Sequence, residues 1–216
     1  MPLSSTLKSL LTICVLADFA FSTVGNYKCA VCFRNSCIDD EQRTCEASHG
    51  CFNHKQELKL PGQSPILIQE KGCSLHECVP LSFTASLGNK LLGYGIQCCQ
   101  EELCNKGDIQ VSQNSSVPNG VICPACYIED DVSCEPVPLA CTGTETKCIE
   151  VFGSVFPGVA VFAQGCATET ACNLKKMSIM DTTMIHTSCR NHGSGSSQWY
   201  PLSHQLISFF LLKVLL

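Results

Sequence analysis

Nineteen of the 216 residues are cysteine, and their spacing constrains the fold more than any other feature. This share is close to that of disulfide scaffolds, and cytosolic proteins, whose thiols are kept reduced, seldom carry so many. The densest point is the adjacent pair Cys98 and Cys99, followed after four residues by Cys104. Because adjacent cysteines cannot easily bond each other, each needs a different partner. We therefore expect this stretch to connect the end of a module to its earlier strands.

The cysteines form two sets with matching landmarks. Each set opens with Cys-x-x-Cys, at Cys29 and at Cys123, and each has a long gap after its fifth cysteine that ends in Gly-Cys, at Gly72-Cys73 and Gly165-Cys166. Matching landmarks in the same order indicate an internal repeat. We therefore expect two homologous domains with ten and eight cysteines, each of which closes without a bond to the other.

Short β-branched runs around Pro-Gly dipeptides predict a β-hairpin in each long gap. Further short strands are expected just before the late cysteines, and no internal segment has a helical period. The expected hairpin strands are 57–60 and 65–69 around Pro61-Gly62, and 146–152 and 159–163 around Pro157-Gly158; the late strands are 91–97 and 184–188. We predict a small, disulfide-rich, all-β fold, in which each bridge contributes roughly 3 kcal/mol to stability.

The N-terminus has the layout of a secretory signal peptide, with Lys8, an apolar run over 9–16 and small residues before Gly25. We expect residues 1–25 to be removed by cleavage after Gly25, with Ser22 as the other candidate. Removal takes away Cys14 and leaves 18 cysteines, an even number. The alternative is a buried N-terminal helix.

The C-terminus predicts a GPI-attachment signal, because small residues over 193–197 precede a spacer and an apolar tail over 206–216. A spanning helix needs ~20 apolar residues, and this tail is shorter. Ser194 is the expected attachment residue, although Gly193 and Gly195 fit the pattern as well. In this prediction 191–194 form a stem and 195–216 are removed. The alternative is a C-terminal amphipathic helix.

A stretch rich in Ser, Asn, Gln, Pro and Gly separates the two cysteine sets and is predicted to be a linker over 106–121. The first domain is then expected over 26–105 and the second over 122–190. The linker carries the only Asn-x-Ser/Thr sequon, at Asn114, where we expect an N-linked glycan unless the sequon is unused.

Several kinds of chemistry are disfavoured. The chain is acidic, with a net charge of −5, which argues against nucleic-acid binding. A zinc site or a redox Cys-x-x-Cys is disfavoured by the signal peptide and the absence of a thioredoxin-like pattern. The acidic pairs at 39–40 and 130–131 are interpreted as solvated turns, since they offer too few oxygen ligands for calcium. We expect no catalytic residues, no metal and no cofactor.

The cysteine pattern resembles the lymphocyte antigen 6/urokinase receptor (Ly6/uPAR, PLAUR) family of three-finger domains. The closing Cys98-Cys99-x4-Cys104-Asn105 and the opening Cys29-x2-Cys32-x4-Cys37 carry the resemblance. The stretch 141–149 is similar to gamma-type phospholipase inhibitors, and 123–127 resembles GPI-anchored two-domain members of epithelial and germ cells. The resemblance covers 27–189 and implies two tandem three-finger domains.

The family pattern also implies a set of disulfides and a role for Asn105, which in members bonds backbone near the cysteine-rich base; alternatively Asn105 is only a turn residue. The second domain departs from the pattern, because it has no closing bridge after Cys189 and its third finger is less certain. The implied pairs are Cys29–Cys51, Cys32–Cys37, Cys45–Cys73, Cys78–Cys98, Cys99–Cys104, Cys123–Cys148, Cys126–Cys134, Cys141–Cys166 and Cys172–Cys189.

The leading functional hypothesis is a non-catalytic, GPI-anchored protein of the outer cell surface that recognises an extracellular protein in adhesion, receptor modulation or microbe binding. A shed or secreted form of the same protein is compatible with this hypothesis. Phe152 and Phe156, near a turn of the second domain, are candidate ligand contacts, or they pack back on their own domain; 60–65 is a weaker candidate. The alternative is a secreted phospholipase inhibitor. A third option is a modulator of a receptor or channel on the same membrane.

Overall fold

The computed structural model describes residues 25–37, 43–111, 115–129, 134–155 and 158–190, and their regular structure is twelve β-strands with three short 3₁₀ turns. None of the helices in these ranges is long and apolar enough to cross a membrane. The strands are β1 (Tyr27–Phe33), β2 (Arg43–Ala47), β3 (Cys51–Lys59), β4 (Ile66–Cys73), β5 (Leu81–Leu87), β6 (Lys90–Cys99), β7 (Pro118–Glu129), β8 (Val137–Thr142), β9 (Lys147–Val155), β10 (Val159–Ala167), β11 (Met177–Ile179) and β12 (Thr183–Arg190). The turns are η1 (Arg34–Cys37), η2 (Cys104–Lys106) and η3 (Glu169–Ala171).

The two expected hairpins are present as β3–β4 and β9–β10, and the late strands as β6 and β12. In the first hairpin, the amide of Gln63 donates to the Leu60 carbonyl at 3.2 Å. Gly62 has a φ of +70°, a left-handed conformation that glycine adopts without a Cβ clash. All strand pairs are antiparallel, as expected where short connections join consecutive strands, and this agrees with the predicted all-β fold class.

The described chain contains nine disulfides, the same nine pairs that the resemblance implies. Six of them close loops of 17 residues or more along the chain. None of these nine pairs joins the first set of cysteines to the second. The adjacent Cys98 and Cys99 bond to Cys78 and Cys104, so each does reach a different partner.

Asn105 is a buried part of the cysteine-rich base of the first domain, not only a turn residue. Its Nδ2 donates to the carbonyls of Ala30 and Phe52 at 2.9 and 3.0 Å. Its Oδ1 accepts from the Ala30 amide at 2.9 Å. With 3% exposure, one side chain thus satisfies backbone groups of β1 and β3 that face the interior.

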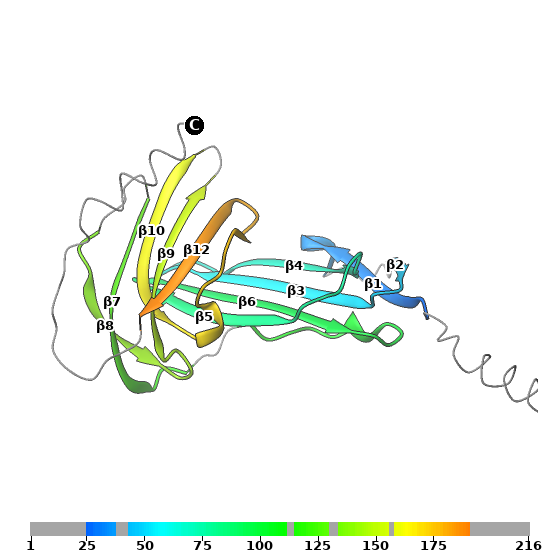
Figure 1. Ribbon diagram of the computed structural model, residues 1–216, viewed down its shortest axis with the longest axis horizontal. Helices are drawn as coiled ribbons and strands as arrows, with labels where there is room; N and C mark the ends of the chain where they lie inside the picture. The colour runs from blue at the N-terminus through cyan, green and yellow to red at the C-terminus, as the bar shows by residue number, and fades with distance from the viewer. Residues whose placement is uncertain (1–24, 38–42, 112–114, 130–133, 156–157, 191–216) are drawn as a thin grey trace, which may run out of the picture.

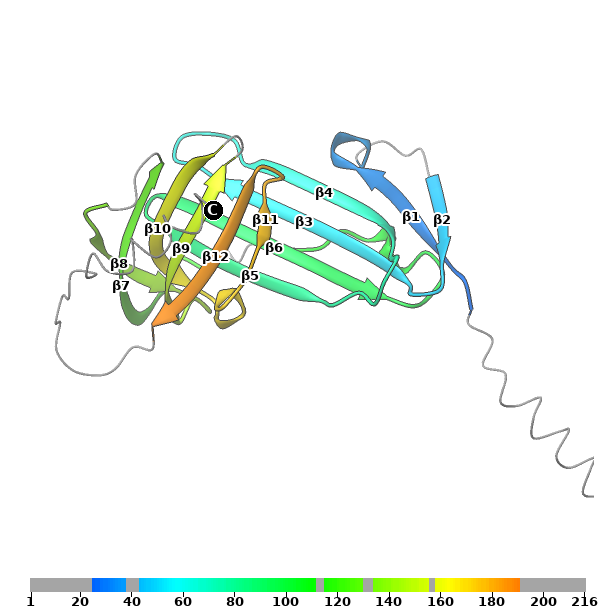
Figure 2. The same ribbon diagram turned by 45° about the horizontal axis from the view of Figure 1, so that its top comes forward.

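The two three-finger domains share one sheet, which the sequence did not indicate. One edge of β10 is divided: 161–164 pair with β7 of the second domain, and 165–167 pair with β5 of the first. Figures 1 and 2 show β9, β10 and β12 crossing the long strands of the first domain, with β1–β2 at one end of the molecule and β7–β8 at the other.

The two domains also share a hydrophobic core. Along β5 the side chains alternate: the apolar ones face the shared core, and the polar ones face the opposite way. Twelve buried residues of both domains form one cluster: Phe83, Ala85, Leu87, Leu92, Tyr94, Ile149, Val151, Ala163, Ala167, Ala171, Ile179 and Ile185.

Part of the segment expected to be a linker is packed. Ile109 and Val111 are buried, at 4% and 7% exposure, and lie against Gly95 of β6. Strand β7 already begins at Pro118. The two aliphatic side chains explain the difference, because burying them against the first domain removes apolar surface from water. Because the neighbouring residues are mostly polar, the composition of this segment indicated a linker in spite of these two aliphatic residues.

Candidate binding groove between the two domains

A groove of about 670 Å³ lies between the two domains. Its floor is formed by buried residues of the shared core. One wall is the β3–β4 hairpin and the other consists of the ends of β9, β10 and β12. The apolar lining residues are Leu58, Leu60, Ile66, Leu67, Ile68, Phe83, Ala85, Leu87, Leu92, Ile149, Val151, Val155, Val161, Ala163, Ala171, Ile179, Met180 and Ile185. The lining also includes Arg34, Lys90, Tyr127, Glu129, Thr182, Thr183 and Thr187.

The hairpin wall presents aliphatic side chains to solvent. Ile66 and Leu67 are 46% and 47% exposed although both are large and apolar. They begin β4, where 66–68 reads Ile-Leu-Ile instead of alternating with polar residues. An uninterrupted apolar run places aliphatic side chains on both faces of the strand. This run is the sequence signal for the groove, although from sequence it predicts only a strand.

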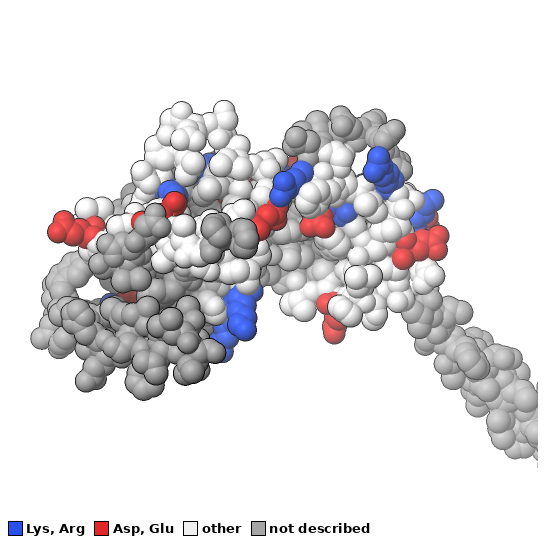
Figure 3. All heavy atoms as spheres, turned by 90° about the horizontal axis from the view of Figure 1, so that it is seen from above, with Lys and Arg blue, Asp and Glu red and all other residues white. Residues whose placement is uncertain are grey.

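Two ion pairs at the rim of the groove join one domain to the other. Arg34 pairs with Asp181 at 2.5 Å, and Lys90 pairs with Glu129 at 3.4 Å. The Lys90 ammonium also lies 3.3 Å from the centre of the Tyr127 ring. On the face shown in Figure 3 the charged residues lie scattered between large uncharged areas. Exposed pairs of this kind contribute little energy, and the groove that they border is lined mainly by apolar side chains.

A polar contact next to the groove fixes the turn between β11 and β12 on the first domain. The Gln56 side chain, 2% exposed, accepts a hydrogen bond from the Met180 amide at 2.7 Å. Its Nε2 lies 3.1 Å from Nε2 of His54. Burial lowers the pKa of His54, and the nearby Asp181 partly opposes this. His54 is therefore held predominantly neutral at neutral pH, in a position to hydrogen-bond with Gln56.

The groove contains no constellation for catalysis or metal binding among the described residues. The three groups of cysteines whose sulfur atoms lie close together all consist of disulfide-bonded residues. Oxidised sulfur lacks the thiolate that a zinc ion requires. What the geometry offers is an apolar surface with polar margins, which is the usual composition of a binding site.

Comparisons with known proteins agree with this description. No family model matches the chain. Protein RoBo-1 of Rattus norvegicus is 41% identical over 193 residues, which cover 85% of this chain and 78% of that protein. A gamma-type phospholipase A2 inhibitor of Elaphe climacophora is 32% identical, covering 75% of this chain and 83% of that protein. The Ly6/PLAUR domain-containing protein 8 of Bos taurus is 26% identical, covering 59% of each chain.

The chain belongs to the Ly6/uPAR family. The family relatives are non-catalytic, and this member is not an enzyme. A disulfide-rich Ly6/uPAR protein belongs to the extracellular space or the cell surface, where disulfides persist.

Only some of the site residues predicted for this Ly6/uPAR protein lie within the described residues. Phe152 lies on β9, is 41% exposed and packs its ring 4.9 Å from that of Phe162 on β10. It thus packs on its own domain while one face stays in solvent, and it does not line the groove. Phe156, the sequon Asn114, Ser194, the signal segment and the acidic pairs at 39–40 and 130–131 lie outside the described residues. Of the weaker candidate 60–65, Leu60 does line the groove.

Proposed function

We propose that this Ly6/uPAR protein is a GPI-anchored binding protein of the outer cell surface whose interdomain groove takes an apolar segment of an extracellular protein. The observation that carries the proposal is the groove itself, because both domains contribute its apolar lining and the exposed Ile66 and Leu67 extend it. An apolar surface left open on a folded protein marks an interaction site. A protein segment is the occupant that fits the family, since the relatives named as phospholipase A2 inhibitors act on another protein.

The groove is tested with a matched pair of leucine substitutions. Leu67→Asp places a charge in the groove, whereas Leu75→Asp alters an even more exposed leucine, 83% exposed, in the loop after β4 and outside the groove. We expect Leu67→Asp to weaken binding of the soluble protein to ligand-bearing cells at least about tenfold, and Leu75→Asp to leave it unchanged. Equal binding by both variants, measured by flow cytometry with each variant shown to be folded, would contradict the groove as the site.

The GPI anchor is inferred from the small-residue triplet, the spacer and the apolar tail of the C-terminus. Phosphatidylinositol-specific phospholipase C is expected to release the protein from expressing cells, and mass spectrometry of the released C-terminus should find the glycan remnant on Ser194 or on Gly193 or Gly195. A glycan at Asn114 is expected in the same preparation. Retention on cells with an intact C-terminal peptide would exclude the anchor.

A second candidate function is the secreted phospholipase A2 inhibitor. It is favoured by the similarity to the inhibitor of Elaphe climacophora, which extends over 75% of this chain. A soluble inhibitor needs no anchor signal, so the two candidates differ in the fate of the tail. Protein found in the medium that ends near Leu216 and blocks phospholipase A2 in a vesicle-hydrolysis assay would favour the inhibitor.

A further inference from the structure

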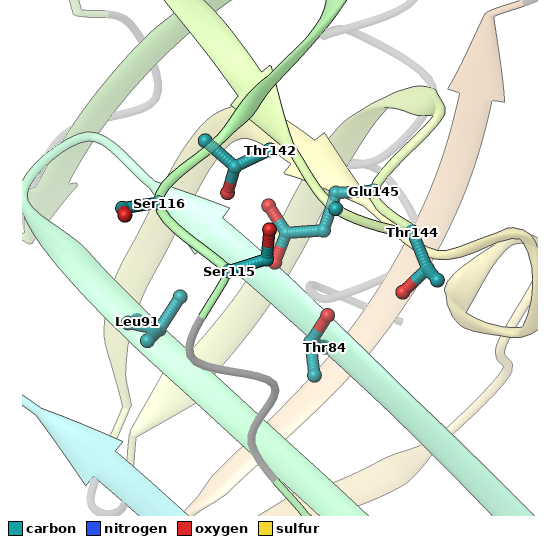
Figure 4. A pocket seen from close by; sticks show the side chains of 8 residues that line it. Thr84, Leu91, Ser115, Ser116, Thr142, Thr144 and Glu145 are labelled. Atoms are coloured by element: carbon teal, nitrogen blue, oxygen red, sulfur yellow. The ribbon is translucent and has the colours of Figure 1, made fainter.

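A second, polar cavity of about 280 Å³ lies at the junction of the two domains, away from the residues of the groove. Its residues come from β5 and β6 of the first domain, from the segment before β7, and from the end of β8 with the turn that follows it. They are Thr84, Leu91, Ser115, Ser116, Thr142, Gly143, Thr144 and Glu145. Figure 4 shows the Glu145 carboxylate at the centre of this set, with the hydroxyls of Thr84, Ser115 and Thr142 turned toward it.

The turn that carries Glu145 is held in place by hydrogen bonds. The Nδ2 group of Asn119 donates to the carbonyls of Gly143 and Glu145, both at 3.0 Å. The Gly143 amide donates to the Val117 carbonyl at 3.2 Å, and Gly143 has a φ of +54°. The carboxylate is thus carried by a constrained turn, which positions it before any ligand arrives.

Glu145 is a buried acid without a countercharge. The residue is 5% exposed, its Oε2 has no hydrogen-bond partner in the described chain, and it forms none of the ion pairs found there. Burial raises its pKa, while hydrogen bonds from Ser86 and Thr84 act in the opposite direction. No charged side chain of the described ranges contributes to this shift. Buried carboxylates are normally paired or hydrogen-bonded. The unpaired Oε2 of Glu145 can therefore accept a hydrogen bond from a cationic partner.

The lining restricts the chemistry of that partner. Among the described residues, no lysine or arginine lines the cavity, so it is not built for an anion, and no aromatic ring lines it, so it is not a cage for a quaternary ammonium. Calcium and magnesium ions take six or more oxygen ligands, and the described lining of the cavity offers a single carboxylate. A primary ammonium needs three acceptors, which one carboxylate and the surrounding hydroxyls supply. Leu91 offers an apolar wall for the methylene stem of the amine.

We propose that this cavity binds a primary ammonium group, such as a lysine side chain of a protein partner, with Glu145 as the anionic contact and the hydroxyls of Thr84, Ser115 and Thr142 as the remaining acceptors. Binding requires the ionised carboxylate. The affinity therefore rises as pH increases through the raised pKa of Glu145, and it stays high until the amine itself loses its proton.

The test is an NMR titration of the protein purified from expressing cells, in which the amides of Thr84, Gly143 and Glu145 are followed. The probe is Nα-acetyl-lysine methylamide, and the matched neutral compound is the same molecule acetylated on its ε-nitrogen. We expect saturable shifts with the ammonium probe and none with the acetylated compound. Glu145→Gln should weaken binding at least about tenfold, since hydrogen bonds to charged groups are the strong ones.

Controls separate the cavity from general electrostatics and from misfolding. Glu77→Gln makes the same charge change at an exposed residue of the β4–β5 loop and should bind the probe as the unchanged protein does. Thr142→Val keeps the carboxylate and removes one acceptor, so it should weaken binding less than Glu145→Gln. The proposal is overturned if Glu145→Gln retains full affinity, if the acetylated compound binds equally well, or if the ammonium probe gives no saturable shift in these amides.

Discussion

At the residue scale, Asn105 is a buried polar side chain that holds strands of the first domain together. It forms hydrogen bonds with the backbone of two different strands from a position immediately after the Cys99–Cys104 bridge. The disulfide brings the residue to the interior, and the amide is the side chain that supplies both a donor and an acceptor there. Aspartate, which is nearly isosteric, would point an acceptor at the Ala30 and Phe52 carbonyls instead.

Asn105→Ala is expected to lower the free energy of unfolding by about 3 kcal/mol, because buried backbone groups lose their partners. The measurement is urea unfolding with the disulfides intact. Asn89→Ala, at an exposed position in the turn between β5 and β6, serves as the control and should stay within about 0.5 kcal/mol. A small effect at Asn105 would mean that water can replace the amide.

At the element scale, the division of the β10 edge between β7 and β5 joins the domains. Gly165 lies at the point where β10 changes partner, opposite Leu87 in the register. A Cβ on Gly165 would overlap the backbone carbonyl of Ser86, so only glycine lets β5 approach. The pairing continues beyond the strand, where the Thr168 amide donates to the Thr84 carbonyl at 3.0 Å.

Gly165→Ala is therefore expected to push β5 away from β10 and to destabilise the protein by more than about 2 kcal/mol. Hydrogen exchange of the amides in 84–87 and 165–168 should speed up more than that of β3 or β4. Gly107→Ala is the matched control, since Gly107 has a φ of −59° and open space around its Cβ position. Unchanged protection in 165–168 would show that the strands tolerate the extra methyl group.

At the scale of the whole molecule, the first domain supports the second. The second domain lacks the closing bridge, but its strand β10 pairs with β5, its core residues join those of the first domain, and two ion pairs cross the junction. A small domain with fewer disulfides has little core of its own. We therefore expect the two domains to unfold together.

Glu145 makes this junction sensitive to pH. Burial raises its pKa in the folded state above the ordinary 4.5, so the unfolded chain ionises first as pH rises. Stability is therefore lost between pH 4.5 and the raised pKa, and the loss stays constant above it. Glu145→Gln should be more stable than the unchanged protein at neutral pH, with a difference that shrinks as pH falls toward 4.5. Thermal unfolding across this range measures the difference, and a difference that stays constant with pH would contradict the account.

The sequence by itself determined the fold class and the disulfide-rich character of the base of each domain. Cysteine spacing indicated the repeat and carried the family resemblance, and the nine pairs were implied by that resemblance, because spacing alone does not give connectivity. Pro-Gly dipeptides located the hairpins at Gly62 and Gly158 because turn conformations are local. The anchor, the leader and the glycan remain predictions from sequence alone.

Only the tertiary structure decided how the two domains meet. The pairing of β10 with β5 joins residues about eighty positions apart, and it depends on an approach distance at Gly165 that no local pattern encodes. The groove and the Glu145 cavity arise on opposite faces of β5, where alternation sends apolar side chains one way and polar ones the other. Sequence shows such alternation but not what lies across from each face, because burial is a property of two surfaces brought together.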